Sequence, residues 1–385
     1  MTQTIFIPRE TEVGEPRVAA SADTVKRLIA LGFKVKVETG AGAGSRIADS
    51  DFSATGAVIC EAKDSCTADV VLKVRRPTPI EISTYTPGTI VIATMEPYGS
   101  EVAIGGMAQF GLTAFAMELM PRITRAQSMD VLSSQANLAG YQAVIEAAHE
   151  FDRAMPMMMT AAGTVPAAKV FVMGAGVAGL QAIATARRLG AAVSATDVRP
   201  AAKEQVASLG AKFIAIEDQE FKAAETAGGY AKEMSKDYQS KQAALVADHI
   251  SKQDIVITTA LIPGRPAPRL VTRAMLASMR PGSIVVDLAL ERGGNVEGSE
   301  AGIVCEIEGV KVIGYTNVAG RIPASATTLY AKNLLTFLES MIDKETKSVR
   351  VNINDELVKA TMLTHAGLVV HPNFHSRKEE QGEGK

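Results

Sequence analysis

The sequence predicts an α/β protein made of two doubly wound parallel-sheet domains, the first of them discontinuous. Three observations predict this fold class. The 385 residues are enough for two domains of the usual ~150 residues each. Short β-rich runs alternate with helical stretches along most of the chain, as in right-handed βαβ units. Apolar residues make up 47% of the chain and aromatic residues only 5%, which is typical of parallel sheets covered by closely packed helices.

Charge and cysteine content exclude several classes of protein. The 40 basic and 42 acidic residues give a net charge of −2, so no broad basic surface for nucleic acid or anionic lipid is expected. Cys60, Cys66 and Cys305 lack the short spacing of a zinc or redox motif, and we interpret them as reduced thiols in a cytosolic protein. The N-terminus lacks the pattern of a signal peptide, and no uncharged stretch reaches the ~20 residues of a membrane helix. We therefore expect no segment of this chain to cross a membrane.

The first series of elements occupies the N-terminal third of the chain. Strands are expected at residues 4–8, 34–38, 57–60, 70–74 and 89–94, with a helix near 21–31. Around residues 120–148 the pattern changes to one long helical segment with few breakers after Arg125. The first domain boundary is placed in this segment.

A second series follows a stretch rich in proline and methionine. Strands are expected at residues 169–173, 192–197, 212–216, 254–260, 283–290 and 310–317, enough for a complete doubly wound sheet. A further helix near 324–341 precedes polar strand-like segments and a frayed charged tail. Two long helices then bracket the second sheet, which predicts a first domain of residues 1–135 and 323–385, a second of 136–322, and a cleft between them.

The most informative motif is GAGVAG, which follows the apolar strand 169–173 and opens a helix. Here Gly174 permits a tight turn, Gly176 lets the backbone approach a pyrophosphate, and Gly179 allows the helix and strand to pack closely. The helix N-terminus offers N–H groups to the phosphates. Asp197 ends the next strand, where a carboxylate can accept hydrogen bonds from both adenosine ribose hydroxyls and repel a 2′-phosphate. This favours NAD(H) over NADP(H); the alternative is a glycine turn with a capping aspartate.

A polar set lies in PRITRAQSMDVLSSQ. Arg122, Gln127, Asp130 and Ser133 are spaced so that the last three could line one face of a helix starting near Arg125. Such a set can orient a carboxamide and a ribose, but the carboxylate is its only group suited to act as a base near neutral pH. A solvated ion pair at a helix N-terminus explains the spacing equally well.

Residues 225–238, ETAGGYAKEMSKDY, fill a long gap between two strands of the second sheet. The Gly228–Gly229 pair could hinge a lid that carries Tyr230, although the residues alone favour a surface helix. His365, His371 and His375 match no usual metal-ligand spacing, and no metal is expected.

Taken together, these motifs make the chain closely resemble the soluble NAD(H)-binding component, domain I, of proton-translocating nicotinamide nucleotide transhydrogenase. That family shares its ancestry and its Rossmann-like fold with alanine dehydrogenase. The resemblance spans nearly the whole chain, through PRETEVGEPRVA, AMELMPRITRAQSMDVLSSQANLAGYQAV, VMGAGVAGLQAIATA, ATDVR, ETAGGYAKEM, ITTALIPG and VDLALERGGN.

The resemblance implies roles for particular residues. It implies that the nicotinamide end of NAD(H) contacts Arg122, Gln127, Asp130 and Ser133. It implies that the pyrophosphate and adenosine contacts come from Gly174, Gly176, Val177, Gly179, Asp197, Val198 and Leu261. It also implies that Gly229 and Tyr230 belong to a mobile loop that closes over the nucleotide.

Alanine dehydrogenase is the closest competing interpretation, and it needs a proton acceptor. That family has a histidine after the strand matching 89–94 and an aspartate at the position matching Glu291. Here the first region reads IATMEPYGS without histidine, and the second carries glutamate. Arg17 and Lys73 match the dehydrogenase's carboxylate-binding positions, but without the acid–base pair we interpret them as inherited or structural.

The resemblance implies direct hydride transfer between NADH on this chain and NADP⁺ on a partner chain, coupled to proton translocation by membrane-spanning partners. Exchange of one dihydronicotinamide for another releases no proton at the reacting atoms, so alignment replaces acid–base catalysis. We expect a homodimer on the cytoplasmic side of the membrane complex. A non-catalytic NAD(H) sensor is a further alternative.

Overall fold

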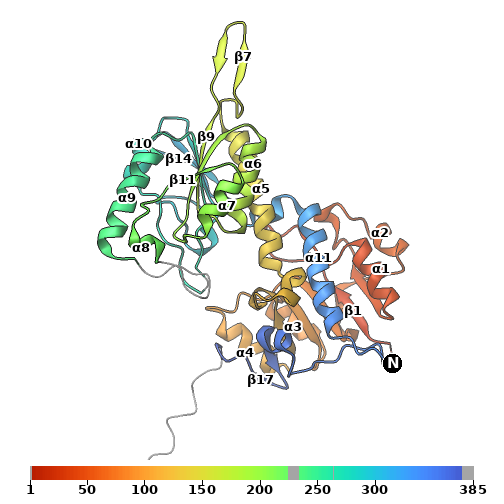
Figure 1. Ribbon diagram of the computed structural model, residues 1–385. Coiled ribbons are helices and arrows are strands. Elements are labelled where there is room, and N and C mark those ends of the chain that lie inside the picture. Colours follow the sequence, from red (N-terminus) through yellow and green to blue (C-terminus); the bar gives the residue numbers. More distant parts are fainter. Residues whose placement is uncertain (1, 224–233, 263, 375–385) are drawn as a thin grey trace, which may run out of the picture. The chain divides into compact units, whose positions relative to one another are not determined.

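The computed structural model describes residues 2–223, 234–262 and 264–374. The chain forms two compact units, coloured along the sequence in Figure 1. Unit 1 comprises Met1–Gln135 and Ile322–Lys385, and unit 2 comprises Ala136–Arg321. Unit 1 is therefore built from both ends of the chain, whereas unit 2 is one continuous segment.

An eight-stranded sheet forms the centre of unit 1. Its strands are β1 (Thr4–Ile7), β2 (Lys34–Glu38), β3 (Val58–Cys60), β4 (Val70–Arg75), β5 (Ile90–Thr94), β6 (Thr113–Ala116), β16 (Met362–His365) and β17 (Leu368–Val369). The order is β17-β16-β6-β5-β4-β1-β2-β3, in which β1 to β6 are parallel and β16 and β17 are antiparallel additions. The parallel part has the doubly wound order 3-2-1-4-5-6.

Helices cover both faces of this sheet. They are α1 (Ala22–Ala30), α2 (Asp49–Ala54), α3 (Pro79–Thr84), α4 (Glu101–Gln109), α11 (Pro323–Ser340) and α12 (Glu356–Thr361). Alternate residues of each strand enter separate cores: Ile5 and Leu72 pack with α1 and α11, whereas Phe6 and Val71 pack with α4. Because both faces are buried, the central strands are apolar throughout.

Unit 2 contains a seven-stranded sheet. Its strands are β9 (Lys169–Met173), β10 (Ala192–Thr196), β11 (Lys212–Phe213), β12 (Ile255–Thr258), β13 (Ile284–Asp287), β14 (Val304–Ile307) and β15 (Val310–Ile313). The order is β11-β10-β9-β12-β13-β15-β14, with only the edge strand β14 antiparallel to its neighbour. From β9 the chain adds strands toward β11, and it then returns to add β12 and the later strands on the other side of β9. Such a change in strand order places a ligand site at the carboxyl ends of β9 and β12.

The helices of unit 2 are α6 (Val177–Arg188), α7 (Ala202–Ser208), α8 (Gln219–Lys222), α9 (Lys236–Ile250) and α10 (Arg273–Ser278). The 20-residue helix α5 (Val131–Glu150) begins in unit 1 and continues into unit 2. Within unit 2 it lies so close to α6 that a Cβ on Gly140 would be 2.0 Å from the Ala178 carbonyl oxygen. Glycine at residue 140 is therefore required by the contact between the two helices.

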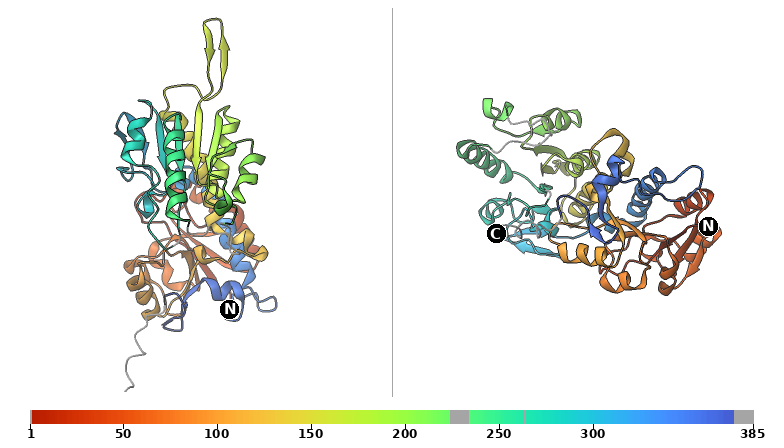
Figure 2. Two further views of the ribbon diagram at one scale, coloured as in Figure 1. Left: turned by 60° about the vertical axis from the view of Figure 1, so that its left-hand side comes forward. Right: turned by 90° about the horizontal axis from the view of Figure 1, so that it is seen from below.

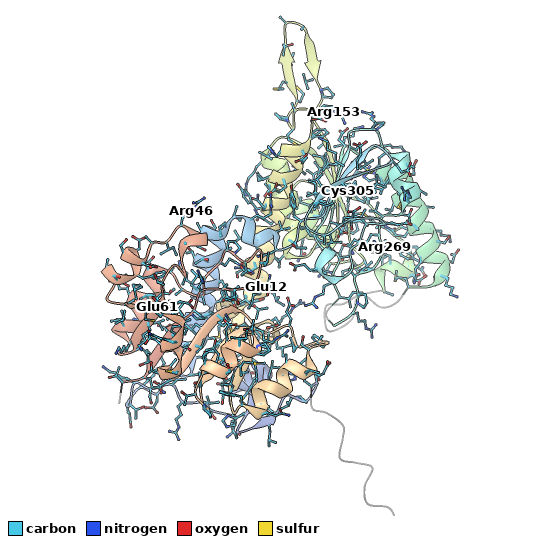
Figure 3. The ribbon with its side chains drawn as sticks, turned by 180° about the vertical axis from the view of Figure 1, so that it is seen from behind. Glu12, Arg46, Glu61, Arg153, Arg269 and Cys305 are labelled. Atoms are coloured by element: carbon cyan, nitrogen blue, oxygen red, sulfur yellow. The ribbon has the colours of Figure 1, made fainter. Side chains whose placement is uncertain are left out.

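A small hairpin projects from unit 2, formed by β7 (Met158–Thr160) and β8 (Gly163–Val165) (Figures 1 and 2). Arg153 lies at its base (Figure 3) and places its guanidinium 4.8 Å from the centre of the Phe151 ring. Short 3-10 helices complete the secondary structure at Ala43–Ser45, Ala62–Thr67, Met117–Leu119 and Thr124–Met129 (η1 to η4), and at Leu290–Arg292 and Val318–Arg321 (η5 and η6).

The predicted fold class is confirmed, and β2 and β9 have the predicted bounds. One local prediction is wrong: the segment around residues 120–148 is not one continuous helix after Arg125. The 3-10 helix η4 ends at Met129, Asp130 is extended with φ −75° and ψ 95°, and α5 begins at Val131. Asp130 breaks the helix because its side chain caps the turn that follows. Strands β6 and β14 and the hairpin were not predicted.

Candidate dinucleotide site

The glycine turn of unit 2 lies at the carboxyl end of the central strand β9. Gly174 has a φ of +106°, a conformation that residues with a side chain rarely adopt. A Cβ there would also lie 2.5 Å from the Thr259 hydroxyl, which donates to the Gly174 carbonyl at 3.1 Å. The turn is thus fixed both by its own backbone and by the residue that follows β12.

The other two glycines of the motif have opposite surroundings. A Cβ on Gly179 would be 1.8 Å from the Gly174 carbonyl oxygen, so this glycine allows α6 to pack against the turn. At Gly176 no atom lies within 4 Å of such a Cβ. Gly176 is the N-cap of α6 and supplies no side-chain cap, and Val177 beside it is 41% exposed. The turn therefore leaves open space in front of the helix N-terminus, where an anion is favoured.

The carboxyl end of β10 contributes Asp197 to the same turn. Its Oδ2 accepts a hydrogen bond from the Ala175 backbone N–H at 2.7 Å, which ties the end of β10 to the glycine turn. Val198 is 63% exposed and Leu261, after β12, is 53% exposed. The parallel register of β9 with β10 and β12 brings these segments to one edge of the sheet. A glycine turn, a carboxylate and two exposed apolar side chains therefore lie along this edge.

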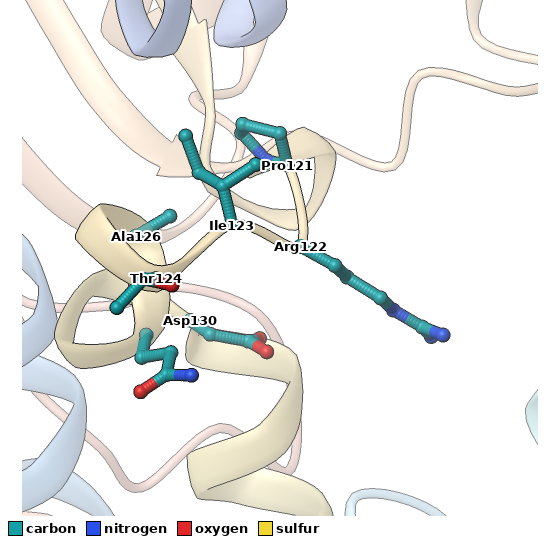
Figure 4. Close-up of a pocket in the computed structure, with 7 residues that line it drawn as sticks. Pro121, Arg122, Ile123, Thr124, Ala126 and Asp130 are labelled. Carbon is teal, nitrogen blue, oxygen red and sulfur yellow. The ribbon is translucent and has the colours of Figure 1, made fainter. Parts of the chain in front are cut away.

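The polar set of unit 1 lies around η4. A surface pocket of about 380 Å³ is lined by Pro121, Arg122, Ile123, Thr124, Ala126, Gln127 and Asp130. Figure 4 shows the Arg122 side chain extending away from the other labelled residues. The structure thus brings Gln127 and Asp130 to one pocket, with Ser133 in direct contact with Asp130.

These side chains do not share the helix face that the sequence suggested. Gln127 belongs to the 3-10 helix, Asp130 to the break, and Ser133 to the first turn of α5. Asp130 accepts hydrogen bonds from the Ser133 backbone N–H at 2.9 Å and from the Ser133 hydroxyl at 2.5 Å. The carboxylate therefore acts as the cap of α5.

Comparison with known proteins decides the family. The model of the Alanine dehydrogenase/PNT C-terminal domain matches residues 143–372, and that of the Alanine dehydrogenase/PNT N-terminal domain matches residues 6–139. The chain belongs to the alanine dehydrogenase/PNT family. Membership of this family implies a nucleotide-binding protein of oxidoreductase type.

Within the family, the similarity to transhydrogenase components is high. The chain is 53% identical over 375 residues to an NAD(P) transhydrogenase subunit alpha protein of Rhodospirillum rubrum, covering 96% of this chain and 98% of the relative. A crystal structure of transhydrogenase from Sinorhizobium meliloti is 68% identical, with a TM-score of 0.89, and the match covers 96% of this chain and 100% of that one. Alanine dehydrogenase of Mycobacterium tuberculosis is 31% identical over 300 residues, which is 77% of this chain and 74% of the relative. The resemblance inferred from the sequence is confirmed.

The two cations that match alanine dehydrogenase positions are both buried and paired. Arg17 binds Glu15 through Nε and Nη2, each at 2.6 Å, and donates to the Gln135 amide oxygen at 2.8 Å. Burial alone would raise the pKa of Glu15, but hydrogen bonds and charge from Arg17, together with the charge of Arg75, hold it below its usual value. The charge of Arg17 is therefore largely offset inside unit 1.

Lys73 has a comparable environment. It is 1% exposed and lies 2.6 Å from Glu81 and 3.3 Å from Glu10. Burial raises the pKa of Glu10, while the charge of Lys73 acts to lower it. This lysine is part of an internal ion-pair group and is not at the protein surface.

Two residues near the glycine turn were missed from the sequence, Thr259 and Asn295. The Asn295 side chain is buried, donates to the carbonyls of Ala260 (2.9 Å) and Pro268 (2.7 Å), and accepts from the Ala260 N–H at 3.0 Å. It therefore fixes the backbone beside Leu261. The glycines before Asn295 in RGGN gave the only local signal for it.

Gly229 and Tyr230 lie outside the residues that the structure describes, as do His375 and the charged tail. Among residues 2–223, 234–262 and 264–374, no group of three or more histidine, cysteine or acidic side chains is arranged to hold a metal ion. No helix in the same part of the chain is long and apolar enough to span a membrane.

Proposed function

We propose that this chain is the NAD(H)-binding subunit of a proton-translocating NAD(P) transhydrogenase. In this role it presents NADH to NADP⁺ held on a partner subunit for direct hydride transfer. The observation that carries the proposal is the open space at Gly176, directly in front of the uncapped N-terminus of α6 and beside Asp197. A pyrophosphate fits there because backbone N–H groups and the helix dipole favour negative charge.

In this proposal the residues of unit 2 hold the adenosine diphosphate half. The turn of Gly174, Gly176 and Gly179 receives the pyrophosphate, and Val177 flanks it. Asp197 accepts from the adenosine ribose hydroxyls and disfavours a 2′-phosphate. The exposed side chains of Val198 and Leu261 provide an apolar environment for adenine. Gly229 and Tyr230 remain proposed as part of a loop that closes over the nucleotide.

The residues of unit 1 are proposed to orient the nicotinamide end. Gln127 offers both donor and acceptor atoms, which suits a carboxamide. Asp130 is held by Ser133 and caps α5, so it serves as a fixed acceptor. Arg122, which also lines the pocket, adds a positive charge to this set. When bound, NADH supplies the hydride.

The chemistry of this set fits alignment better than proton transfer. Hydride exchange between two nicotinamides releases no proton at the reacting atoms, so no general base is needed. Orientation of two reactants can supply roughly 7–11 kcal/mol of a barrier. The carboxylate of Asp130 is engaged as a helix cap, and Gln127 and Ser133 do not titrate near neutral pH. Because Asp197 disfavours a 2′-phosphate, NADP(H) is assigned to a partner chain. Proton translocation is assigned to membrane-spanning partners.

The test is reconstitution with the NADP(H)-binding partner. We expect the full chain to bind NADH and, once mixed with the partner, to reduce an NADP⁺ analogue in stopped-flow absorbance measurements. NADH binding without any hydride transfer would instead support the nucleotide sensor. Gel filtration with light scattering tests the proposed homodimer, and co-sedimentation with vesicles that contain the membrane subunits tests the proposed place on the cytoplasmic face.

Alanine dehydrogenase activity is the second candidate, favoured by the 31% identical relative. Against it stand the missing histidine after β5 and the carboxylate partners of Arg17 and Lys73. We expect no NADH formation from L-alanine and NAD⁺ by the isolated chain. Turnover of L-alanine at a rate comparable to that of hydride transfer would overturn this assignment.

A further inference from the structure

The carboxylate of Asp197 is already fully hydrogen-bonded by residues of unit 2. Oδ1 accepts from the Arg199 backbone N–H at 2.8 Å and from Arg199 Nε at 2.9 Å. Oδ2 accepts from the Ala175 N–H at 2.7 Å and from Arg199 Nη2 at 2.9 Å. The Asp197 side chain is 7% exposed, whereas that of Arg199 is 32% exposed.

As long as Arg199 keeps these contacts, Asp197 has no acceptor position for a ribose. An ionised carboxylate offers about four acceptor positions, and four donors already occupy them here. Two of the donors are backbone N–H groups, one in the glycine turn and one just after β10, and they cannot leave without local refolding. The other two donors belong to the partly exposed guanidinium of Arg199, a side chain that can be displaced without a change in the backbone. A ribose hydroxyl must therefore displace Arg199 to reach Asp197.

The same ion pair changes the charge that a nucleotide meets. The guanidinium neutralises the carboxylate that would repel a 2′-phosphate. Once displaced, it stays two residues from Asp197, and arginine binds phosphate through paired N–H groups. Asp197 with Arg199 is thus a weaker barrier to NADP(H) than Asp197 alone.

We propose that Arg199 determines nucleotide specificity at this site by competing with the ribose for Asp197. The proposal rests on the function proposed above and concerns the same site. In it, Arg199 weakens NAD(H) binding, because its ion pair must open first, and lessens the discrimination against NADP(H), because it supplies a positive charge beside the 2′-position.

The test compares Arg199→Gln with the unaltered full chain. NADH and NADPH are titrated separately and followed by nucleotide fluorescence. We expect Arg199→Gln to bind NADH about fivefold more tightly and NADPH about fivefold more weakly, since ~1 kcal/mol is typical of an ion pair that is partly exposed. Arg199→Lys keeps the positive charge but lacks the paired N–H groups of the guanidinium. Its affinities for NADH and NADPH should therefore lie between those of the unaltered chain and Arg199→Gln.

Lys203→Gln is the matched control. Lys203 is also a basic residue and lies in α7, the helix that follows β10, but it pairs with Glu217 and not with Asp197. Its substitution removes one positive charge and should leave the ratio of NADH to NADPH affinity within twofold. An equal change in Lys203→Gln would assign the effect to net charge and overturn the proposal.

Unchanged NADH binding in Arg199→Gln would also overturn the proposal, because the guanidinium would then have no effect on NADH affinity. Weaker NADH binding would overturn it as well, because the guanidinium would then contact NADH directly. If the unaltered chain binds NADH, such a result leaves the proposed function standing. If the unaltered chain fails to bind NADH, both the function and the role of Arg199 are wrong. Thermal unfolding of each variant establishes that the affinities belong to folded chains.

Discussion

Gly176 and Gly179 lie three residues apart in one turn, yet alanine should have opposite effects at the two positions. At Gly176 the new methyl group enters open space, and φ is −76°, which any residue can adopt. Replacing a glycine N-cap by alanine lowers the free energy of unfolding by up to about 1 kcal/mol. The lower conformational entropy of the unfolded alanine chain raises it by about 0.4–1 kcal/mol. The free energy of unfolding should therefore change by less than about 1 kcal/mol.

The methyl group on residue 176 would occupy the space assigned to the pyrophosphate. We expect the dissociation constant for NADH to rise at least about tenfold, which corresponds to a loss of about 1.4 kcal/mol of binding free energy. Isothermal titration calorimetry with NADH measures this directly.

At Gly179 the methyl group would lie 1.8 Å from the Gly174 carbonyl oxygen. Overpacking costs up to about 3 kcal/mol, and the better helix propensity of alanine returns about 1 kcal/mol. The net loss of about 2 kcal/mol should lower Tm by roughly 4–8 °C, as measured by calorimetry. Unchanged NADH affinity in Gly176→Ala, or unchanged Tm in Gly179→Ala, would refute the roles assigned to these glycines.

Three further predictions concern residues outside the turn. Gly140→Ala places a Cβ 2.0 Å from the Ala178 carbonyl oxygen, and we expect a loss of about 1–3 kcal/mol in urea unfolding together with weaker NADH binding. Asp130→Ala removes the cap of α5 and should cost about 0.5–2 kcal/mol; Ser133→Ala in that background should add little, since its partner is gone. Burial raises the pKa of Glu118 from 4.5 to about 7, so its contribution to stability is complete below pH 4.5 and is lost as the pH rises through 7. Unfolding of Glu118→Gln, measured from pH 4.5 to 8, should lack that part of the pH dependence.

Much of the fold could be predicted because its strands are apolar and evenly spaced. The runs KVKVE and KVFVM have the strand bounds that periodicity predicts. In contrast, β14 is a short edge strand with intermediate burial, and its sequence VCEI carries a weak pattern. The hairpin β7–β8 is exposed, so no buried face marks it in the sequence. Local pattern therefore located most of the buried strands but missed β14, the hairpin and also β6, which is buried but only four residues long.

In the site, too, features that depend on neighbouring residues could be predicted from the sequence, whereas features that depend on distant contacts could not. The glycines of GAGVAG form a local motif, so their spacing located the turn, although the contact of Gly174 with Thr259 comes from a distant part of the chain. The contacts of Asn295 depend on a return of the chain from a different strand, which no local pattern reports. The pairing of Asp197 with Arg199 is local, but it depends on a side-chain rotamer and on the Ala175 N–H, neither of which spacing specifies. The helix break at Asp130 was missed because the helix propensity of the surrounding residues favours one continuous helix. In the structure the Asp130 carboxylate instead caps a new helix by accepting a hydrogen bond from the Ser133 N–H.

The division of unit 1 between the two ends of the chain has a consequence for biosynthesis. Helix α11 inserts Tyr330, Leu334 and Phe337 among residues of the N-terminal strands, and β16 pairs with β6. A ribosome must therefore release nearly all of the polypeptide before those strands gain their covering, whereas the intervening segment is complete much earlier. Until then the part of the apolar face that α11 covers stays exposed in the nascent chain, which makes this stage the one at which molecular chaperones are most needed.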